Sequence, residues 1–254
     1  MSAIVDVDVQ PSADAVMRAA AEQVVDAAVG AARASGRFAI ALAGGATPRQ
    51  LYTLLATPPY VARVEWRAVH VFWGDERGVP PDDPASNYRM ARATLLAQVS
   101  VAPEHVHRIH GEEAPPVAAT AYERELRAAF ATPTGPPRPL AGARLDLVLL
   151  GMGDNGHTAS LFPHSPVLDE RQRWVVADHV DATPPARVTL TAPVINAAAL
   201  ALFLVVGAAK AAMLRRVLEG PRDPAALPAQ LVAPTNGRVR WIVDAAAAAQ
   251  LTKC

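Results

Sequence analysis

The stretch that decides the fold is RFAIALAGGATPRQLYTLLA, residues 37–56. Its first seven residues are nearly all apolar, which is typical of a strand buried on both faces of a parallel sheet. Two glycines interrupt the run, and residues 47–56 then predict a helix with Thr47 as its cap and Pro48 at its first position. A buried strand followed by a helix is the repeating unit of an α/β protein.

The rest of the chain repeats this alternation. Further apolar or alternating runs predict strands at residues 68–76, 104–110, 144–151, 187–193, 200–207 and 238–244. Helical patterns occupy residues 12–34, with Ser12 as cap, 86–98, 116–130, 208–220 and an alanine-rich terminal segment. Residues 131–143 are rich in proline and glycine and predict a surface loop. We therefore predict an α/β fold with a mostly parallel sheet, helices on both of its faces, and a single domain over residues 1–254.

Composition narrows the class of protein. The 254 residues can bury a sizeable core, and 24 Lys and Arg residues balance 24 Asp and Glu residues. This balance argues against nucleic acid or an anionic membrane as a partner. The single cysteine, Cys254, cannot form an internal disulfide, and the longest apolar runs are too short to span a bilayer. The first residues lack the basic start and apolar core of a signal peptide, so we expect a cytoplasmic protein.

Ligands of open α/β sheets bind beyond the carboxyl ends of the strands, so the loops at these ends form the candidate site. In the first loop, AGGATP at 43–48, Gly44 and Gly45 allow the backbone to approach a ligand, and the next helix directs its N–H groups at it. A phosphate cradle is one interpretation, and a plain strand-to-helix turn is the other. The spacing matches neither a Walker loop nor a dinucleotide-binding motif.

The second loop, WGDERGVPPDDPASNY at 73–88, carries charge directly after a buried strand. Asp75, Glu76 and Arg77 come first. Their position favours a site role for Asp75 and Arg77, and an arginine there could pair with a phosphate or with a developing oxyanion. A solvated charge cluster is the alternative, and it is preferred for the two later aspartates.

The third loop, GMGDNGHTASLFP at 151–163, presents one histidine. Gly151 and Gly153 bend the chain, and His157 is expected near the start of a short helix. Its unperturbed pKa near 6.5 suits a general base at neutral pH. The helix dipole would favour the neutral, proton-accepting ring. A histidine that only caps a turn is the alternative.

The fourth loop, VGAAKAAM at 206–213, places Lys210 on the first turn of a helix, from which it can reach an anion at the edge of the sheet. A solvated helix lysine is the alternative. Arg187, just before VTLT, is a similar candidate. His105, His107 and His110 do not suggest a metal site, because only two of them share a face of the expected strand and no cysteine or carboxylate cluster completes the set.

Six motifs together resemble one family. LAGGATP, WGDERGVP…SNY, LLGMGDNGHTASLFP, RVTLT, VVGAAKA and PAQLVAPTNGRVRWIVD occur in the order found in 6-phosphogluconolactonases, and they resemble glucosamine-6-phosphate deaminases more distantly. The similarity covers residues 37 to 248. It implies a Rossmann-like fold without a required cofactor. It also implies hydrolysis of 6-phosphoglucono-1,5-lactone to 6-phosphogluconate, the second step of the oxidative pentose phosphate pathway.

The resemblance also implies site residues. The family's histidine, its base, falls on His157. The positions for the substrate and its phosphate fall on Gly44, Gly45, Thr47, Arg77, Arg187 and Lys210. The family usually reads G-x-G-x-D-G-H, whereas this chain has Asn155 before the glycine and Asp154 one place earlier. Asn155 can orient the histidine by a hydrogen bond but cannot supply charge, so the candidate catalytic residues are His157, Asn155 and Asp75.

In the mechanism that we expect, His157 deprotonates a water that attacks C1, and Arg77 or backbone N–H groups stabilise the oxyanion. Phosphate binding positions the lactone. One rival is a deaminase, but its motifs read nearer D-E-Y and G-H-I-A-F-N-E-P. The other is a non-catalytic sugar-phosphate sensor, which would lose the base. Ser160 is not expected to be a nucleophile, because TASLF is not a G-x-S-x-G elbow. We expect a monomer, with a weak homodimer as the alternative.

Overall fold

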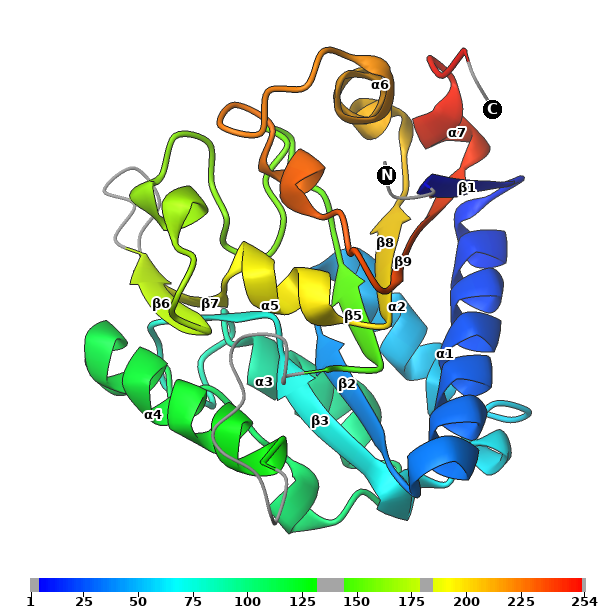
Figure 1. Ribbon diagram of the computed structural model, residues 1–254. Helices are drawn as coiled ribbons and strands as arrows, with labels where there is room; N and C mark the ends of the chain where they lie inside the picture. The colour runs from blue at the N-terminus through cyan, green and yellow to red at the C-terminus, as the bar shows by residue number, and fades with distance from the viewer. Residues whose placement is uncertain (1–4, 132–143, 179–184, 253–254) are drawn as a thin grey trace.

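A six-stranded sheet forms the centre of the computed structural model, which describes residues 5–131, 144–178 and 185–252 (Figure 1). All pairings in this sheet are parallel, in the order β1-β9-β8-β5-β2-β3. Its strands are β1 (Val5–Gln10), β2 (Phe38–Leu42), β3 (Val69–Trp73), β5 (Leu147–Leu150), β8 (Leu200–Val205) and β9 (Arg238–Asp244). The predicted mostly parallel α/β fold class is confirmed.

The middle of the sheet consists of the three strands with the most continuous apolar sequences. Every residue of β2, β5 and β8 is buried. Strands covered on both faces need apolar residues at successive positions, which explains why their sequences predicted them. The edge strand β1, with the alternating sequence VDVDVQ, is not among the predicted strands.

The helices largely follow the prediction. They are α1 (Ala13–Ser35), α2 (Ala46–Leu55), α3 (Asn87–Ala91), α4 (Pro115–Ala129), α5 (Ala192–Ala197), α6 (Ala211–Glu219) and α7 (Ala245–Ala248). Ser12 caps α1 as predicted, since its hydroxyl accepts a hydrogen bond from Ala15 N. In Figure 1, α1 and α2 stand on one side of the sheet, and α4 on the other.

A second, antiparallel sheet has the order β4-β7-β6. Its strands are β4 (Asp75–Arg77), β7 (Arg187–Leu190) and β6 (Val175–Asp178). The predicted strand at 68–76 is therefore two strands, because the chain leaves the large sheet at Gly74 and enters the small one. This change of sheet turns the expected acidic loop into a paired strand.

Two local predictions are wrong. Thr47 does not cap α2, because the helix already begins at Ala46 and is preceded by Gly45 in the left-handed region, with φ 107°. Residues 104–110 form no strand: a 3-10 helix covers Pro103–His105, and the segment touches β3 through one isolated bridge. The proline-rich loop lies outside the described residues from position 132 on. Within the described ranges, no helix has the length and apolar character needed to cross a membrane.

Candidate active site

The loops that follow four parallel strands meet at one edge of the large sheet. Gly74 N donates to the carbonyl of Leu42, which joins the ends of β3 and β2. Lys210 Nζ donates to the carbonyl of Met152, which joins the segment after β8 to the loop after β5. Carboxyl ends of parallel strands lie together by construction, so residues far apart in the sequence converge here.

His157 is held in one tautomer by Asn155. The backbone N–H of His157 faces Asn155 Oδ1 at 3.2 Å, and because an N–H only donates, this atom must be the amide oxygen. The same oxygen lies 2.6 Å from Nδ1 of the ring. Nδ1 therefore carries the proton, and Nε2 is left as the proton acceptor. Asn155 orients the histidine as the sequence suggested.

Glycine is required beneath this ring. A Cβ on Gly153 would overlap the imidazole of His157, so the ring packs directly on the glycine backbone. The ring of Phe162 also lies near the imidazole, with 4.6 Å between the ring centroids. The predicted helix near His157 is not formed: the chain makes turns there, and Ala159 adopts a φ of 46°. The helix whose dipole was expected to act on the ring is therefore absent from this loop.

Burial, not a helix dipole, is the largest cause of the lowered pKa of His157. The positive charges of Lys210 and Arg187 act in the same direction. The carboxylates of Asp75 and Asp154 oppose them. A lowered pKa keeps the ring unprotonated at neutral pH, so that it can accept a proton. These interactions also show that the structure brings together side chains that the sequence separates widely.

Asp154 serves a different partner. Its carboxylate pairs with Lys210 Nζ at 2.5 Å, and this ion pair holds the pKa of Asp154 below its usual value. The aspartate therefore does not replace Asn155 as the hydrogen-bond partner of the imidazole. Lys210 is held at the loop that follows β5 by the ion pair with Asp154 and by the hydrogen bond to the carbonyl of Met152.

Two arginines face each other across the small sheet. Arg77 on β4 is directly opposite Arg187 on β7. Arg77 donates through Nη1 to the carbonyl of Ala85, but its Nε and the Nη1 of Arg187 are buried without a hydrogen-bond partner among the described residues. The pKa of Arg187 is lowered, first by burial and then by the charge of Arg77. Like charges in cross-strand contact are unfavourable, so this pair with unused donors is suited to an anion.

Asp75 lies beside this pair in the interior. Its Oδ2 accepts a hydrogen bond of 2.6 Å from the hydroxyl of Ser160, and its Oδ1 accepts one of 3.3 Å from the amide of Asn87. All three side chains are buried. The oxygen of the Asn87 amide points at Gly44, where any Cβ would overlap it. The space at this glycine is thus filled by Asn87.

Glu76 has a structural role. Its carboxylate accepts hydrogen bonds from the backbone N–H groups of Arg77, Asn87 and Tyr88 and from the hydroxyl of Ser86. Burial raises its pKa although these N–H groups oppose the shift. The residue ties β4 to the start of α3 and thereby places its neighbours.

The glycine loop contributes open donors. Gly45 is exposed, and Thr47 is partly exposed on the first turn of α2. No side chain caps this helix. Its first N–H groups are therefore available to an anion, although the structure gives neither residue a contact with the other predicted site residues.

The chain matches the family model of glucosamine-6-phosphate isomerases/6-phosphogluconolactonase over residues 11–241. It belongs to this family. A 6-phosphogluconolactonase of Nostoc sp. is 39% identical over 97% of this chain and 98% of its own length. One of Mycobacterium bovis is 39% identical, covering 96% and 98%. The solved 6-phosphogluconolactonase from Trypanosoma cruzi is 29% identical, with a TM-score of 0.84 and coverage of 99% and 98%. The resemblance drawn from the six motifs is confirmed.

The sequence analysis assigned no site role to three buried residues of this family member: Ser160, Asn87 and Glu76. Ser160 and Asn87 lie inside quoted motifs, TASLF and SNY, but neither motif signals a hydrogen bond to Asp75. Their partners follow from contacts between separate loops, which local sequence does not encode. The available signal was limited to Ser160, a polar residue beside the apolar residues of ASLF, because buried polar groups usually have a hydrogen-bond partner.

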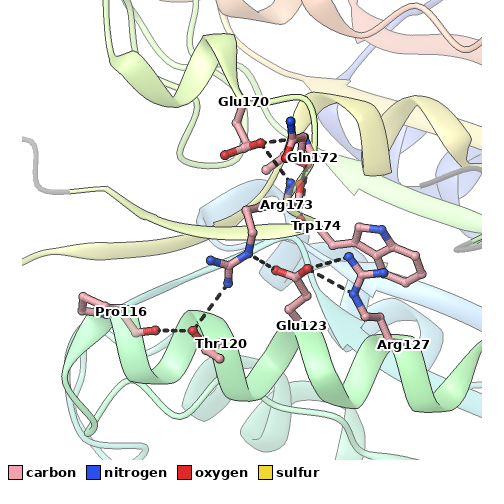
Figure 2. Close-up of polar contacts among 9 residues, drawn as sticks. Pro116, Thr120, Glu123, Arg127, Glu170, Gln172, Arg173 and Trp174 are labelled. Carbon is pink, nitrogen blue, oxygen red and sulfur yellow. Dashed lines mark hydrogen bonds and ion pairs between the residues drawn. The ribbon is translucent and has the colours of Figure 1, made fainter. Parts of the chain in front are cut away.

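An ion-pair network outside the site holds the small sheet of this glucosamine-6-phosphate isomerase/6-phosphogluconolactonase fold in place. Figure 2 shows the carboxylate of Glu123, on α4, between Arg173 and Arg127, with N–O distances of 2.6 and 2.7 Å. Arg127 also stacks over Trp174, just before β6. Burial opposes ionisation of Glu123, but the two arginines hold its pKa below the usual value. The network fixes β6, and through it β7 with Arg187.

Two of the histidines discounted as metal ligands, His105 and His107, pack against His70, and the third, His110, lies 3.4 Å from the carboxylate of Glu112. His105 stacks on His70 at 3.8 Å, and His107 lies between His70 and Glu125, 3.1 and 2.8 Å from them. In the part of the chain that the structure describes, no group of three or more His, Cys, Asp or Glu residues could hold a metal ion.

Proposed function

We propose that the protein hydrolyses 6-phosphoglucono-1,5-lactone to 6-phosphogluconate in the oxidative pentose phosphate pathway, with His157 as the general base. The observation that carries the proposal is the tautomer of His157. Asn155 accepts from Nδ1 and leaves Nε2 as a proton acceptor, and the charge of Arg187, an arginine with an unused donor, acts on the same ring. The class of enzyme follows from the relatives, which are named 6-phosphogluconolactonase and span nearly the whole chain.

In the first step, Nε2 of His157 removes a proton from a water, whose oxygen forms a bond to C1 of the lactone. The carbonyl electrons move to its oxygen. In the second step, the carbonyl re-forms, the bond between C1 and the ring oxygen breaks, and the ring oxygen takes the proton from His157. The carboxylate of Asp75 offsets the positive charge that the imidazole carries between the steps.

The phosphate is the permanent anion of the substrate. We assign it to Arg77 and Arg187, because their guanidinium groups have buried N–H donors without partners among the described residues. Gly44, Gly45 and Thr47 at the start of α2 are the second group of donors in the proposal, and Lys210 the third. Holding the remote phosphate places C1 near the water, which supplies much of the rate enhancement of a reaction that already occurs slowly in water.

Freshly generated lactone provides the test. Its decay is followed with and without protein and corrected for spontaneous hydrolysis. We expect acceleration by the wild type and a loss of about 100-fold or more in kcat for a folded His157→Ala variant. Near-normal kcat in that variant would remove His157 as the base.

The same protein also tests the rivals. Release of ammonia from glucosamine 6-phosphate would indicate a deaminase. Binding of a sugar phosphate without acceleration of lactone decay would indicate a sensor. The relatives named 6-phosphogluconolactonase favour the lactonase over both rivals.

A further inference from the structure

The carboxylate of Asp75 is held by side chains from two other loops. Ser160 donates to Oδ2 at 2.6 Å, and Asn87 donates to Oδ1 at 3.3 Å and to the backbone carbonyl of Asp75 at 2.9 Å. Both oxygens of the carboxylate are thus engaged. A carboxylate fixed at both oxygens cannot rotate toward water, so the direction of its charge is set.

Ser160 is itself fixed from the other side. Its backbone N–H donates to Thr189 Oγ1 at 3.3 Å, and the residue is 1% exposed. Thr189 is paired with Asp75 across the small sheet. The serine therefore joins the loop that carries His157 to two strands of the small sheet, to β4 through Asp75 and to β7 through Thr189. Its hydroxyl proton is committed to the carboxylate.

The fixed charge of Asp75 acts on His157. Four charged groups bear on this ring: Asp75 from β4, Arg187 from β7, Lys210 from the segment after β8, and Asp154 from the same loop. Asp154 already pairs with Lys210, and its side chain is largely exposed. Asp75 is the buried carboxylate of the four groups, so its orientation matters most to the imidazole as it gains a proton.

We propose that Ser160 is a positioning residue for the hydrolysis: its hydroxyl, assisted by the amide of Asn87, holds the Asp75 carboxylate so that its charge stabilises the protonated His157. The inference rests on the proposed function. It gives the serine of the TASLF motif a role other than nucleophile. Because hydrogen bonds to a charged group are strong, loss of the hydroxyl is expected to lower kcat/KM about tenfold, with little change in KM.

The experiment measures the pKa of His157 by NMR titration of its ring signals, and the pH profile of kcat/KM, in matched variants. These are Ser160→Ala, Asp75→Asn and the double variant. Ser165→Ala is the control, because its hydroxyl donates to the carboxylate of Asp178 at 2.8 Å in the same kind of pair, and neither residue is among the groups that act on the pKa of His157. If Ser160→Ala does not fold, Ser160→Cys replaces it, with similar volume and a weaker donor.

Without the hydrogen bond from Ser160, the Asp75 carboxylate is expected to turn toward solvent. Its charge then stabilises the protonated ring of His157 less. Ser160→Ala should therefore lower the pKa of His157 in the direction of Asp75→Asn, move the acid limb of the profile to lower pH, and add nothing in the double variant. Ser165→Ala should change neither quantity. An unchanged or raised pKa in folded Ser160→Ala would overturn the inference. A wild type that does not hydrolyse the lactone would instead contradict the proposed function, and the titration would still report the contact.

Discussion

Replacing Asn155 by aspartate tests how this chain controls its base. The substitution places a carboxylate where the amide oxygen now lies 2.6 Å from Nδ1 of His157. The hydrogen bond is kept, and one negative charge is added. Because the charge favours the protonated ring, the pKa of His157 should rise.

The size of the rise follows from Coulomb's law. A unit charge at about 4 Å is worth about 1 kcal/mol at the dielectric constant of water and about 4 kcal/mol at an effective value of about 20. One pKa unit corresponds to about 1.4 kcal/mol. The ring of His157 is partly buried, so we expect a rise of about 1–3 units.

The pH dependence of kcat/KM provides the assay. In the proposed mechanism the neutral ring is the active form, so a raised pKa should move the acid limb of the profile to higher pH, with activity recovered in alkaline buffer. Asp154→Asn is the control for the direction of the shift, since removal of this carboxylate should lower the pKa of His157 and move the acid limb to lower pH. If Asn155→Asp leaves the limb in place while NMR shows a folded protein, Asn155 does not contact the titrating base, and the reasoning is refuted.

Four further changes separate catalysis from stability. Gly153→Ala places a Cβ where the imidazole of His157 lies and should lower kcat about 100-fold. In the control Gly151→Ala, the added Cβ meets no atom within 4 Å, so most activity should remain; equal kcat values in the two variants would contradict the packing of the ring on Gly153. Arg187→Met should raise KM about tenfold. It should leave the free energy of unfolding in urea unchanged or about 0.5 kcal/mol higher, because the like-charge pair of Arg77 and Arg187 is removed; a clear loss of stability would argue against repulsion between these two arginines. Glu123→Gln should lower the free energy of unfolding by about 1–2 kcal/mol at neutral pH, because the two arginines that pair with the carboxylate are 41% and 45% exposed. Since the pKa of Glu123 lies below 4.5, its contribution is present above that pH and is lost as the pH falls through the folded-state value, so the difference should shrink as the pH falls below 4.5; a constant difference would exclude the ion pairs as its cause. Burial and the neighbouring histidines lower the pKa of His70 from 6.5 to about 4. The wild type should thus lose stability below pH 6.5, by about 1 kcal/mol after allowance for solvent contact, and thermal melts of His70→Gln should lack this loss.

The parallel sheet could be predicted because the sequences of its central strands are themselves typical of buried strands. β2, β5 and β8 are continuous apolar runs, and each is followed by glycine or a helix. Ser12 likewise predicted the start of α1, because the capping hydrogen bond of its hydroxyl involves only neighbouring residues. The edge strand β1 and the short strands β4 and β6 escaped prediction, because their stability depends on partners elsewhere in the chain and not on their own pattern.

The site was predicted to the extent that its residues lie in motifs. His157 and Asn155 are two residues apart, so a contact between them is a local matter. The expected helix after His157 was wrong because a run of residues such as HTASLF has no signal for the turn that forms, with Ala159 in the left-handed region. The pKa of the ring is accordingly lowered by burial, which sequence does not report.

The sequence by itself determined the α/β class and the family, because these depend on local patterns and ordered motifs, and it singled out His157 as the candidate base. Only the tertiary structure decided the partners. Arg77 meets Arg187 because the chain changes sheets at Gly74 and pairs antiparallel in one register, and a shift of one residue would send these side chains to opposite faces. Asp75 finds Ser160 for the same reason: hydrogen bonds between distant loops follow from how the strands pack, and no single segment of the chain carries that information.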